Sequence, residues 1–171
     1  PNLSVAEFSF YRAPISNVFP LKNITLVEAY DLIRSDAYAR VTRQLRSIDN
    51  PAEARAFKAS QFNYATFSGV FTTRRDNGLS KHSGLVTIDF DHVPNVRKLK
   101  ELLLRDEHIP TEMLFVSPSG DGLKWLIPMC DGEMQHSDFF TAVAKYISET
   151  YRLGIDKSGR DISRACFLPC D

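Results

Sequence analysis

Hydrophobic and polar positions follow a regular pattern in the second half of the chain. Apolar residues recur every three or four positions over residues 95–106 and 136–152, which predicts two amphipathic helices. Shorter apolar runs predict four strands, over residues 85–91, 112–117, 123–129 and about 162–168. From residue 85 onward the predicted order is therefore strand, helix, strand, strand, helix, strand.

This order is that of the ferredoxin-like or RRM-like βαββαβ unit, an α+β fold in which two helices pack on one antiparallel sheet. In that plan the first and third strands are central, and the second and fourth lie at the edges. The end of the first strand, the segment 117–124 and the segment 156–164 would then meet at one rim. We therefore expect one site built from three segments that are distant in the sequence.

A different pattern, mainly helical, precedes this unit. Helical spacing extends over residues 24–49, and Thr25 followed by Glu28 has the spacing of a capping box. Pro51 suits the first turn of a short helix that runs through Ala59.

The connection between the two halves predicts the domain organisation. A strand-like run over residues 65–72 and a turn over 74–78 lead into the first strand of the βαββαβ unit. We expect residues 1–60 to be a helical extension that packs on a core of residues 61–171.

Composition limits the class of protein. The chain is 43% hydrophobic and 25% charged, with 21 basic and 21 acidic residues, so its formal net charge is zero. That balance disfavours a free-standing nucleic-acid-binding protein with a basic stripe, but it allows a local basic site. No apolar stretch is long enough for a membrane span, and an odd count of three cysteines argues against a disulfide framework. Because the chain has no such stretch and no charged-then-apolar leader, we expect a cytoplasmic protein. It begins without Met and stops after a strand-like run, so we expect it to be a piece of a longer protein.

The strongest chemical signal is a pair of carboxylates at the end of the 85–91 run. Asp89 and Asp91 are two apart, so in a strand they share one face. Neighbouring carboxylates repel each other, and a divalent cation is the usual reason for such a pair. The alternative is a strand edge whose acids are solvated or paired with Lys or Arg. The expected cofactor is Mg²⁺ or Mn²⁺, as two ions.

A third metal ligand is expected from the segment that follows the last helix. Asp156 is favoured over Asp161, which would also suit a turn or a salt bridge beside Arg160 and Arg164. Two ions held by three carboxylates would clamp a triphosphate and activate an attacking hydroxyl.

The segment 117–124 has the composition of a phosphate-binding loop. Its glycine Gly120 permits close backbone approach, its hydroxyls Ser117 and Ser119 donate hydrogen bonds, and Lys124 adds a positive charge. An ordinary hairpin loop would use the same residue types.

Further cations lie at the same rim or near it. Arg164 is in an otherwise apolar strand and needs an anionic partner, either a carboxylate or a nucleotide phosphate. The loop cations are weaker candidates for contact with nucleic acid, and are otherwise solvated charges: Arg74, Arg75, Lys81 and His82.

Together these motifs resemble the archaeo-eukaryotic primase (primase-polymerase) superfamily. The resemblance rests on Leu85-Val-Thr-Ile-Asp-Phe-Asp91, on Ser117-Pro-Ser-Gly-Asp-Gly-Leu-Lys124 and on Ile155-Asp156 followed by Arg164. The phrases Lys81-His-Ser-Gly-Leu85 and Asp161-Ile-Ser-Arg-Ala165 are similar to those of its VirE N-terminal domain family, found in mobile-element proteins.

The resemblance implies a nucleotidyltransferase core over about residues 58–171. Asp89, Asp91 and Asp156 would then hold the catalytic metals, and Arg164 with the 117–124 segment would hold the phosphates. Expected partners are nucleoside triphosphates, a single-stranded DNA template and a helicase-type ATPase domain in the full-length chain.

One residue departs from the superfamily pattern and keeps other functions open. Lys124 stands where the superfamily has a histidine, and a lysine does not reproduce neutral imidazole chemistry. The leading prediction is a primase or primase-polymerase in replication or mobilisation of a mobile element. The alternatives are a catalytically inactive nucleic-acid-binding module and a metal-dependent nuclease that uses the same acids.

Overall fold

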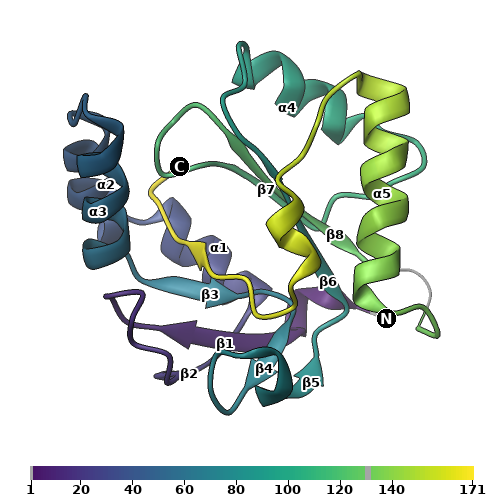
Figure 1. The fold of residues 1–171 in the computed structure, drawn as a ribbon, viewed down its shortest axis with the longest axis horizontal. Helices are drawn as coiled ribbons and strands as arrows, with labels where there is room; N and C mark the ends of the chain where they lie inside the picture. The colour runs from purple at the N-terminus through teal and green to yellow at the C-terminus, as the bar shows by residue number, and fades with distance from the viewer. Residues whose placement is uncertain (1, 130–131) are drawn as a thin grey trace.

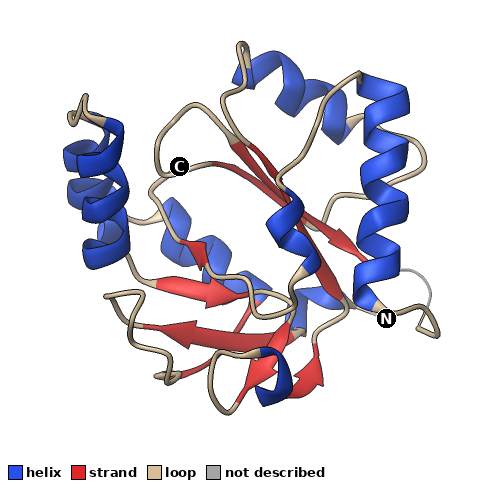
Figure 2. Ribbon diagram, in the orientation of Figure 1, coloured by secondary structure: helices blue, strands red, loops and turns tan. Residues whose placement is uncertain are grey.

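Antiparallel sheets and α-helices make up the fold in the computed structural model of the chain, which describes residues 2–129 and 132–171. The predicted α+β class is therefore confirmed. Figure 1 shows the three-stranded sheet beside α4 and α5, with α2 and α3 at the opposite end of the molecule. Figure 2 marks the same arrangement by secondary structure.

The three-stranded sheet has the order β6-β8-β7 and contains the predicted carboxylate strand. Its strands are β6 (Leu85–Phe90), β7 (Met113–Val116) and β8 (Leu123–Pro128). The helices that follow β6 and β8 are α4 (Val96–Leu104) and α5 (His136–Tyr151). These five elements match the predicted order, and β8 lies between β6 and β7 as the βαββαβ plan requires.

A four-stranded sheet has the order β2-β1-β3-β9. Its strands are β1 (Glu7–Tyr11), β2 (Lys22–Thr25), β3 (Tyr64–Thr66) and β9 (Cys166–Phe167). A separate two-stranded ribbon pairs β4 (Gly69–Phe71) with β5 (Leu79–His82). The remaining elements are α1 (Leu26–Arg34), α2 (Ala39–Arg46), α3 (Pro51–Gln61) and the 3-10 turns η1 (Leu3–Val5), η2 (Asp36–Tyr38), η3 (Asp76–Gly78) and η4 (Lys157–Arg160).

Both faces of the three-stranded sheet are buried. On one face Val86, Ile88 and Trp125 pack in a core with residues of α4 and α5. On the other face Leu85 and Leu126 join a second core formed largely by β1, β2, β3 and α1. Because strand side chains alternate, Asp89 shares the second face with Leu85 and so points toward the four-stranded sheet.

The last strand differs from its predicted position. The βαββαβ plan puts it beside β6, whereas β9 pairs with β3 in the other sheet. The chain after α5 does run along β6, where the Asp156 N–H donates to the Asp89 carbonyl over 2.9 Å. It forms η4 there instead of a strand, so β6 ends the β6-β8-β7 sheet.

The N-terminal segment also differs from its predicted helical character. The strands β1 and β2 lie within residues 1–60, and β1 pairs with β3, so one sheet spans the predicted boundary at residue 60. The predicted helix over 24–49 is divided at Ser35, whose hydroxyl donates to the Leu32 carbonyl and accepts from the Ala37 amide.

Two local predictions in this segment are confirmed. Thr25 and Glu28 form the capping box at the start of α1, and Pro51 is in the first turn of α3. Over the part of the chain that the structure describes, no helix combines the length and apolarity needed to cross a membrane.

Candidate functional site

A cleft lies between α3 and the rim where β6 and β8 meet the η4–β9 segment. It consists of two adjoining hollows of about 350 and about 360 Å³. Both hollows are lined by Arg55, Lys58, Asp91, Lys124 and Phe167. The first also contacts the loop that contains Ser117, Ser119 and Asp121. The second also contacts Arg74, Asp156, Asp161 and Arg164. The three segments predicted to meet at one rim do meet in this cleft.

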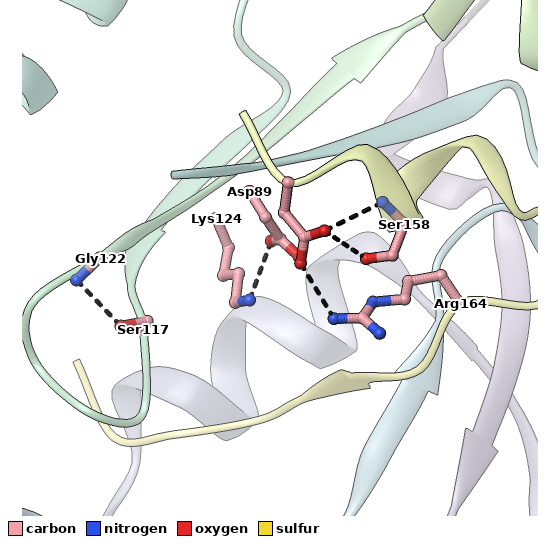
Figure 3. A network of polar contacts seen from close by, with 7 residues as sticks. Asp89, Ser117, Gly122, Lys124, Ser158 and Arg164 are labelled. Carbon is pink, nitrogen blue, oxygen red and sulfur yellow. Dashed lines mark hydrogen bonds and ion pairs between the residues drawn. The ribbon is translucent and has the colours of Figure 1, made fainter. Parts of the chain in front are cut away.

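Asp89 and Lys124 form a buried ion pair at the base of the cleft. They are directly opposite each other in the antiparallel pairing of β6 with β8. The Lys124 Nζ lies 2.9 Å from Oδ1 of Asp89, and the two side chains are only 14% and 5% exposed (Figure 3). Burial alone would lower the pKa of Lys124, but its neighbours Asp89, Cys166 and Asp91 together outweigh burial, with Asp89 first among them, and the pKa is raised. Lys124 is therefore a fixed cation.

The ion pair with Lys124 does not satisfy all of the hydrogen-bonding capacity of the Asp89 carboxylate. Its Oδ1 is buried and, among the described residues, has no partner in hydrogen-bond geometry, although Nζ is close. The attraction that holds the pair is therefore mainly electrostatic, as expected for a desolvated ion pair.

Asp156 is brought to β6 by its own backbone. Its N–H donates to the Asp89 carbonyl over 2.9 Å, so the third predicted acid adjoins the first. The Asp156 Oδ1 accepts from Ser158 N at 2.9 Å and Oγ at 2.7 Å, and Oδ2 accepts from Arg164 Nη2 at 3.3 Å (Figure 3). Burial would raise the pKa of Asp156, but the Ser158 hydrogen bonds and Arg164 outweigh it and lower the pKa. The anion that pairs with Arg164 in the structure is thus a carboxylate.

Asp91 is exposed and lies just beyond β6, where it lines both hollows. The next residue, His92, has a φ of 52°, and its Nδ1 is 2.9 Å from Oδ2 of Asp121. This turn ends β6 at Phe90. Within residues 2–129 and 132–171, no three His, Cys, Asp or Glu side chains form a group that would hold a metal ion.

The segment 117–124 folds as a closed hairpin loop. The Ser117 Oγ accepts from the Gly122 N–H at 3.1 Å, and the Ser117 N–H donates to the Gly122 carbonyl at 2.9 Å (Figure 3). Gly120 has a φ of 86°, a left-handed conformation that glycine adopts readily. Arg46 of α2 donates to the carbonyls of Ser117 and Pro118, which anchors the loop from across the cleft. Ser119 remains exposed at the first hollow.

The helix α3 supplies cations that sequence reasoning missed. Arg55 and Lys58 are three residues apart, so they lie on one helix face, and both line the two hollows. Lys58 forms no ion pair in the described part of the chain. Its pKa is lowered, first by burial and next by the positive charge of Lys124. Asp91 and Asp121 act in the opposite direction, and Arg164 adds a smaller lowering effect. The three-residue spacing was visible in the sequence, but nothing in the sequence directs that face toward β6.

Of the four loop cations predicted as weak candidates for contact with nucleic acid, one lines the cleft. Arg74 lines the second hollow, where its Nε donates to the Tyr64 hydroxyl over 3.1 Å. Arg75, Lys81 and His82 line neither hollow. Lys81 and His82 belong to β5, which is paired with β4.

His82 instead forms a hydrogen-bonded chain with His136 that supports η4. His82 Nδ1 accepts from the Gly84 N–H at 2.9 Å, so its proton is on Nε2 and points to Nδ1 of His136, 3.1 Å away. His136 then donates from Nε2 to the Gly159 carbonyl over 3.1 Å. Each imidazole is neutral in this arrangement, because a second ring proton would face a donor.

Acid is therefore expected to weaken the fold through these two histidines. Burial lowers the pKa of His82 and of His136, and Asp161 and the Gly159 carbonyl only partly offset this for His136. Stability should be retained above the unfolded imidazole pKa of about 6.5 and lost as pH falls toward the folded pKa. Urea unfolding at pH 7.5 and pH 5.0 measures this loss.

A matched variant isolates the contribution of the pair. His82→Gln with His136→Gln should show a smaller decrease in unfolding free energy between the two pH values, while exposed His92 and His108 remain in both proteins. An equal decrease in both proteins would contradict the assignment.

Comparison with known proteins places the chain in one family. A family model described as BT4734-like, N-terminal domain, matches residues 56–171, and the chain belongs to that family. No curated protein matches the chain, and no solved structure matches it. The resemblance to primase-polymerases stays a prediction.

Proposed function

We propose that this member of the BT4734-like N-terminal domain family binds the phosphates of nucleotides or single-stranded nucleic acid in the cleft. The observation that carries the proposal is the state of Lys58. Its ammonium is half-buried and forms no ion pair with a carboxylate among the described residues. Burial and repulsion from Lys124 lower its pKa, although Asp91 and Asp121 act in the opposite direction. A phosphate dianion beside Lys58 would relieve that repulsion.

The balance of charge in the second hollow supports the same ligand. Its cations are Arg55, Lys58, Arg74, Lys124 and Arg164, and its acids are Asp91, Asp156 and Asp161. Asp156 is already bound to Arg164, and Asp161 accepts from Ser163. Counting Asp89, which neutralises Lys124, the second hollow has five cations against four acids, an excess of one positive charge, although the whole chain has a formal net charge of zero. Arginine and lysine in a shallow cleft are the usual means of binding phosphates.

The predicted pair of Mg²⁺ or Mn²⁺ ions does not fit the described arrangement. The acids do not form a three-ligand group, and Lys124 already places a positive charge beside Asp89. For Asp89 to hold a divalent cation, Lys124 would have to release it. The proposed binding needs no metal.

A nucleotidyltransferase of primase-polymerase type is the second candidate. The observation that favours it is the hydrogen bond from the Asp156 amide to the Asp89 carbonyl, which brings the third predicted acid beside the first. The partners predicted from the resemblance belong to this candidate: nucleoside triphosphates, a single-stranded DNA template and a helicase-type ATPase domain, in a cytoplasmic protein. The chemistry of this second candidate is inferred from the resemblance to primase-polymerases.

Replacing Lys58 is expected to weaken binding of a fluorescein-labelled oligo(dT) measured by anisotropy. Lys58→Met keeps an unbranched side chain of similar length and removes its charge. We expect weaker binding, together with a decrease of about 1 in the slope of log K against log salt concentration, because one phosphate contact is lost. Lys145→Met on the exposed part of α5 is the matched control and should bind as the natural chain does.

The outcomes separate the two candidates. If the natural chain binds no oligo(dT) and no tripolyphosphate, the proposal is wrong. If the natural chain binds oligo(dT) but does not extend a primed template in the presence of Mn²⁺ and all nucleotides, it is a binding module. Extension that is lost in Asp91→Asn, an exposed position whose replacement spares the core, would establish the nucleotidyltransferase, and template cleavage would indicate a nuclease.

A further inference from the structure

Phe167 is the feature of the cleft that phosphate binding leaves unexplained. Among the described residues it is the one phenylalanine, tyrosine or tryptophan that lines either hollow, and it lines both. It is only partly buried, whereas its neighbours Cys166 and Leu168 are in the core. The fold thus presents an aromatic surface to a cleft in which many of the other lining residues are charged.

The ring is held in place by the strand that carries it. In the pairing of β9 with β3, Phe167 is opposite Tyr64. Tyr64 and Phe62 meet Phe167 at steep angles of 75° and 70°, with ring centroids 6.2 and 6.3 Å away. Such edge contacts fix the orientation of a ring without stacking on it. Strand pairing and two aromatic neighbours make Phe167 a rigid surface.

The cations of the cleft lie close to this ring. The Lys58 Nζ is over the ring, 6.0 Å from its centroid. Arg55 and Lys124 line the same two hollows as the ring, together with the acid Asp91. A flexible lysine stem allows Lys58 to turn to a phosphate, which uncovers the ring face beneath it. An aromatic face beside cations is the arrangement by which proteins bind single-stranded nucleic acid, with the base stacked and the backbone neutralised.

We propose that Phe167 is the platform on which a base of the bound ligand stacks, so that the cleft takes phosphates that carry a nucleobase. This inference rests on the proposed function and narrows it. The ligand must have an unpaired base, because the faces of a base within a duplex are covered by its neighbours. A single strand or a free nucleotide meets that requirement, and bare phosphate lacks the stacking contribution.

The test compares a normal oligonucleotide with an abasic one. Oligo(dT) and an abasic oligonucleotide of equal length carry the same phosphates, and only the first has bases. Phe167→Leu retains an apolar side chain and removes the aromatic face. We expect Phe167→Leu to weaken oligo(dT) binding by about five- to hundredfold, the range that stacking on one aromatic side chain contributes. Binding of the abasic strand should be unchanged.

Phe167→Trp is the variant that keeps the platform. It should bind oligo(dT) as the natural chain does, and its indole fluorescence should be quenched by oligo(dT) and not by the abasic strand. Trp125 is fully buried and gives the background signal, measured on the natural chain. This variant also shows whether the position tolerates replacement.

The results distinguish failure of this inference from failure of the proposed function. Phe167 stacks no base if Phe167→Leu weakens the binding of oligo(dT) and of the abasic strand equally, or if the natural chain binds the two with equal affinity. In either case phosphate binding by the cleft still stands. If the natural chain binds neither oligonucleotide, the proposed function fails. Thermal unfolding of each variant confirms that the cleft is folded in every comparison.

Discussion

Lys124→Met is expected to lower the free energy of unfolding by about 3–5 kcal/mol, the largest loss among the single changes considered for this chain. Lys124 is the ion-pair partner of Asp89, whose side chain is 5% exposed. Without Lys124 the carboxylate would be left charged in a desolvated position or would have to bind a proton, and either state costs free energy. Urea unfolding at pH 7.5 measures the loss.

The control for this prediction replaces both partners. In Asp89→Leu with Lys124→Met no buried charge remains, so the double variant should recover most of the stability lost in the single one. A double variant as unstable as Lys124→Met would show that side-chain shape, rather than the unpaired carboxylate, causes the loss.

The second large effect is expected at Gly122, where the 117–124 loop enters β8. An added Cβ would lie 2.4 Å from the Phe90 carbonyl oxygen and 3.1 Å from Ser117 Oγ. The first of these is a backbone atom of β6, which has no rotamer that avoids the contact. Gly122→Ala should therefore destabilise the protein by about 1–3 kcal/mol, as overpacking does. It should also weaken oligo(dT) binding, because β6 and the loop must separate.

Gly154→Ala is the matched control for this substitution. An added Cβ there meets no atom within 4 Å, so stability and binding should be nearly unchanged. Equal stability of Gly122→Ala and Gly154→Ala in thermal unfolding would contradict the close approach of the loop to β6.

The elements with strong local patterns were predictable from the sequence. The strand β6, the helices α4 and α5 and the hairpin of β7 with β8 follow from periodicity, because each buries a face whose spacing is visible in the chain. The position of Lys124 beside Asp89 also follows from strand pairing, since residues directly opposite in an antiparallel pair are in contact.

The position of β9 was not predictable in the same way. A run such as Ala165-Cys166-Phe167-Leu168 has a strand-like composition, but composition does not say which sheet it joins. That choice depends on η4 and on Asp156, the residue before it. The Asp156 N–H donates to the Asp89 carbonyl of β6, and His136 of α5 donates to the Gly159 carbonyl of η4, so η4 takes the place beside β6.

The cation face of α3 was missed for a related reason. Arg55 and Lys58 on a helix surface are normally solvated, and the sequence does not show that β3, which follows α3, joins a sheet that brings this surface to the rim of β6. Side chains that come together only through tertiary structure leave no local signal.

The shared sheet has a consequence for where the folding unit ends. The family match begins at residue 56, within α3, but β3 of the matched segment is hydrogen-bonded along one side to β1, which precedes it. A chain cut at residue 56 would have β3 with a bare edge and would expose core side chains such as Phe67 and Leu85 that Phe8 and Ile24 help to cover. The stretch of this chain that the family model matches is therefore shorter than the piece of polypeptide that acquires this structure as a unit.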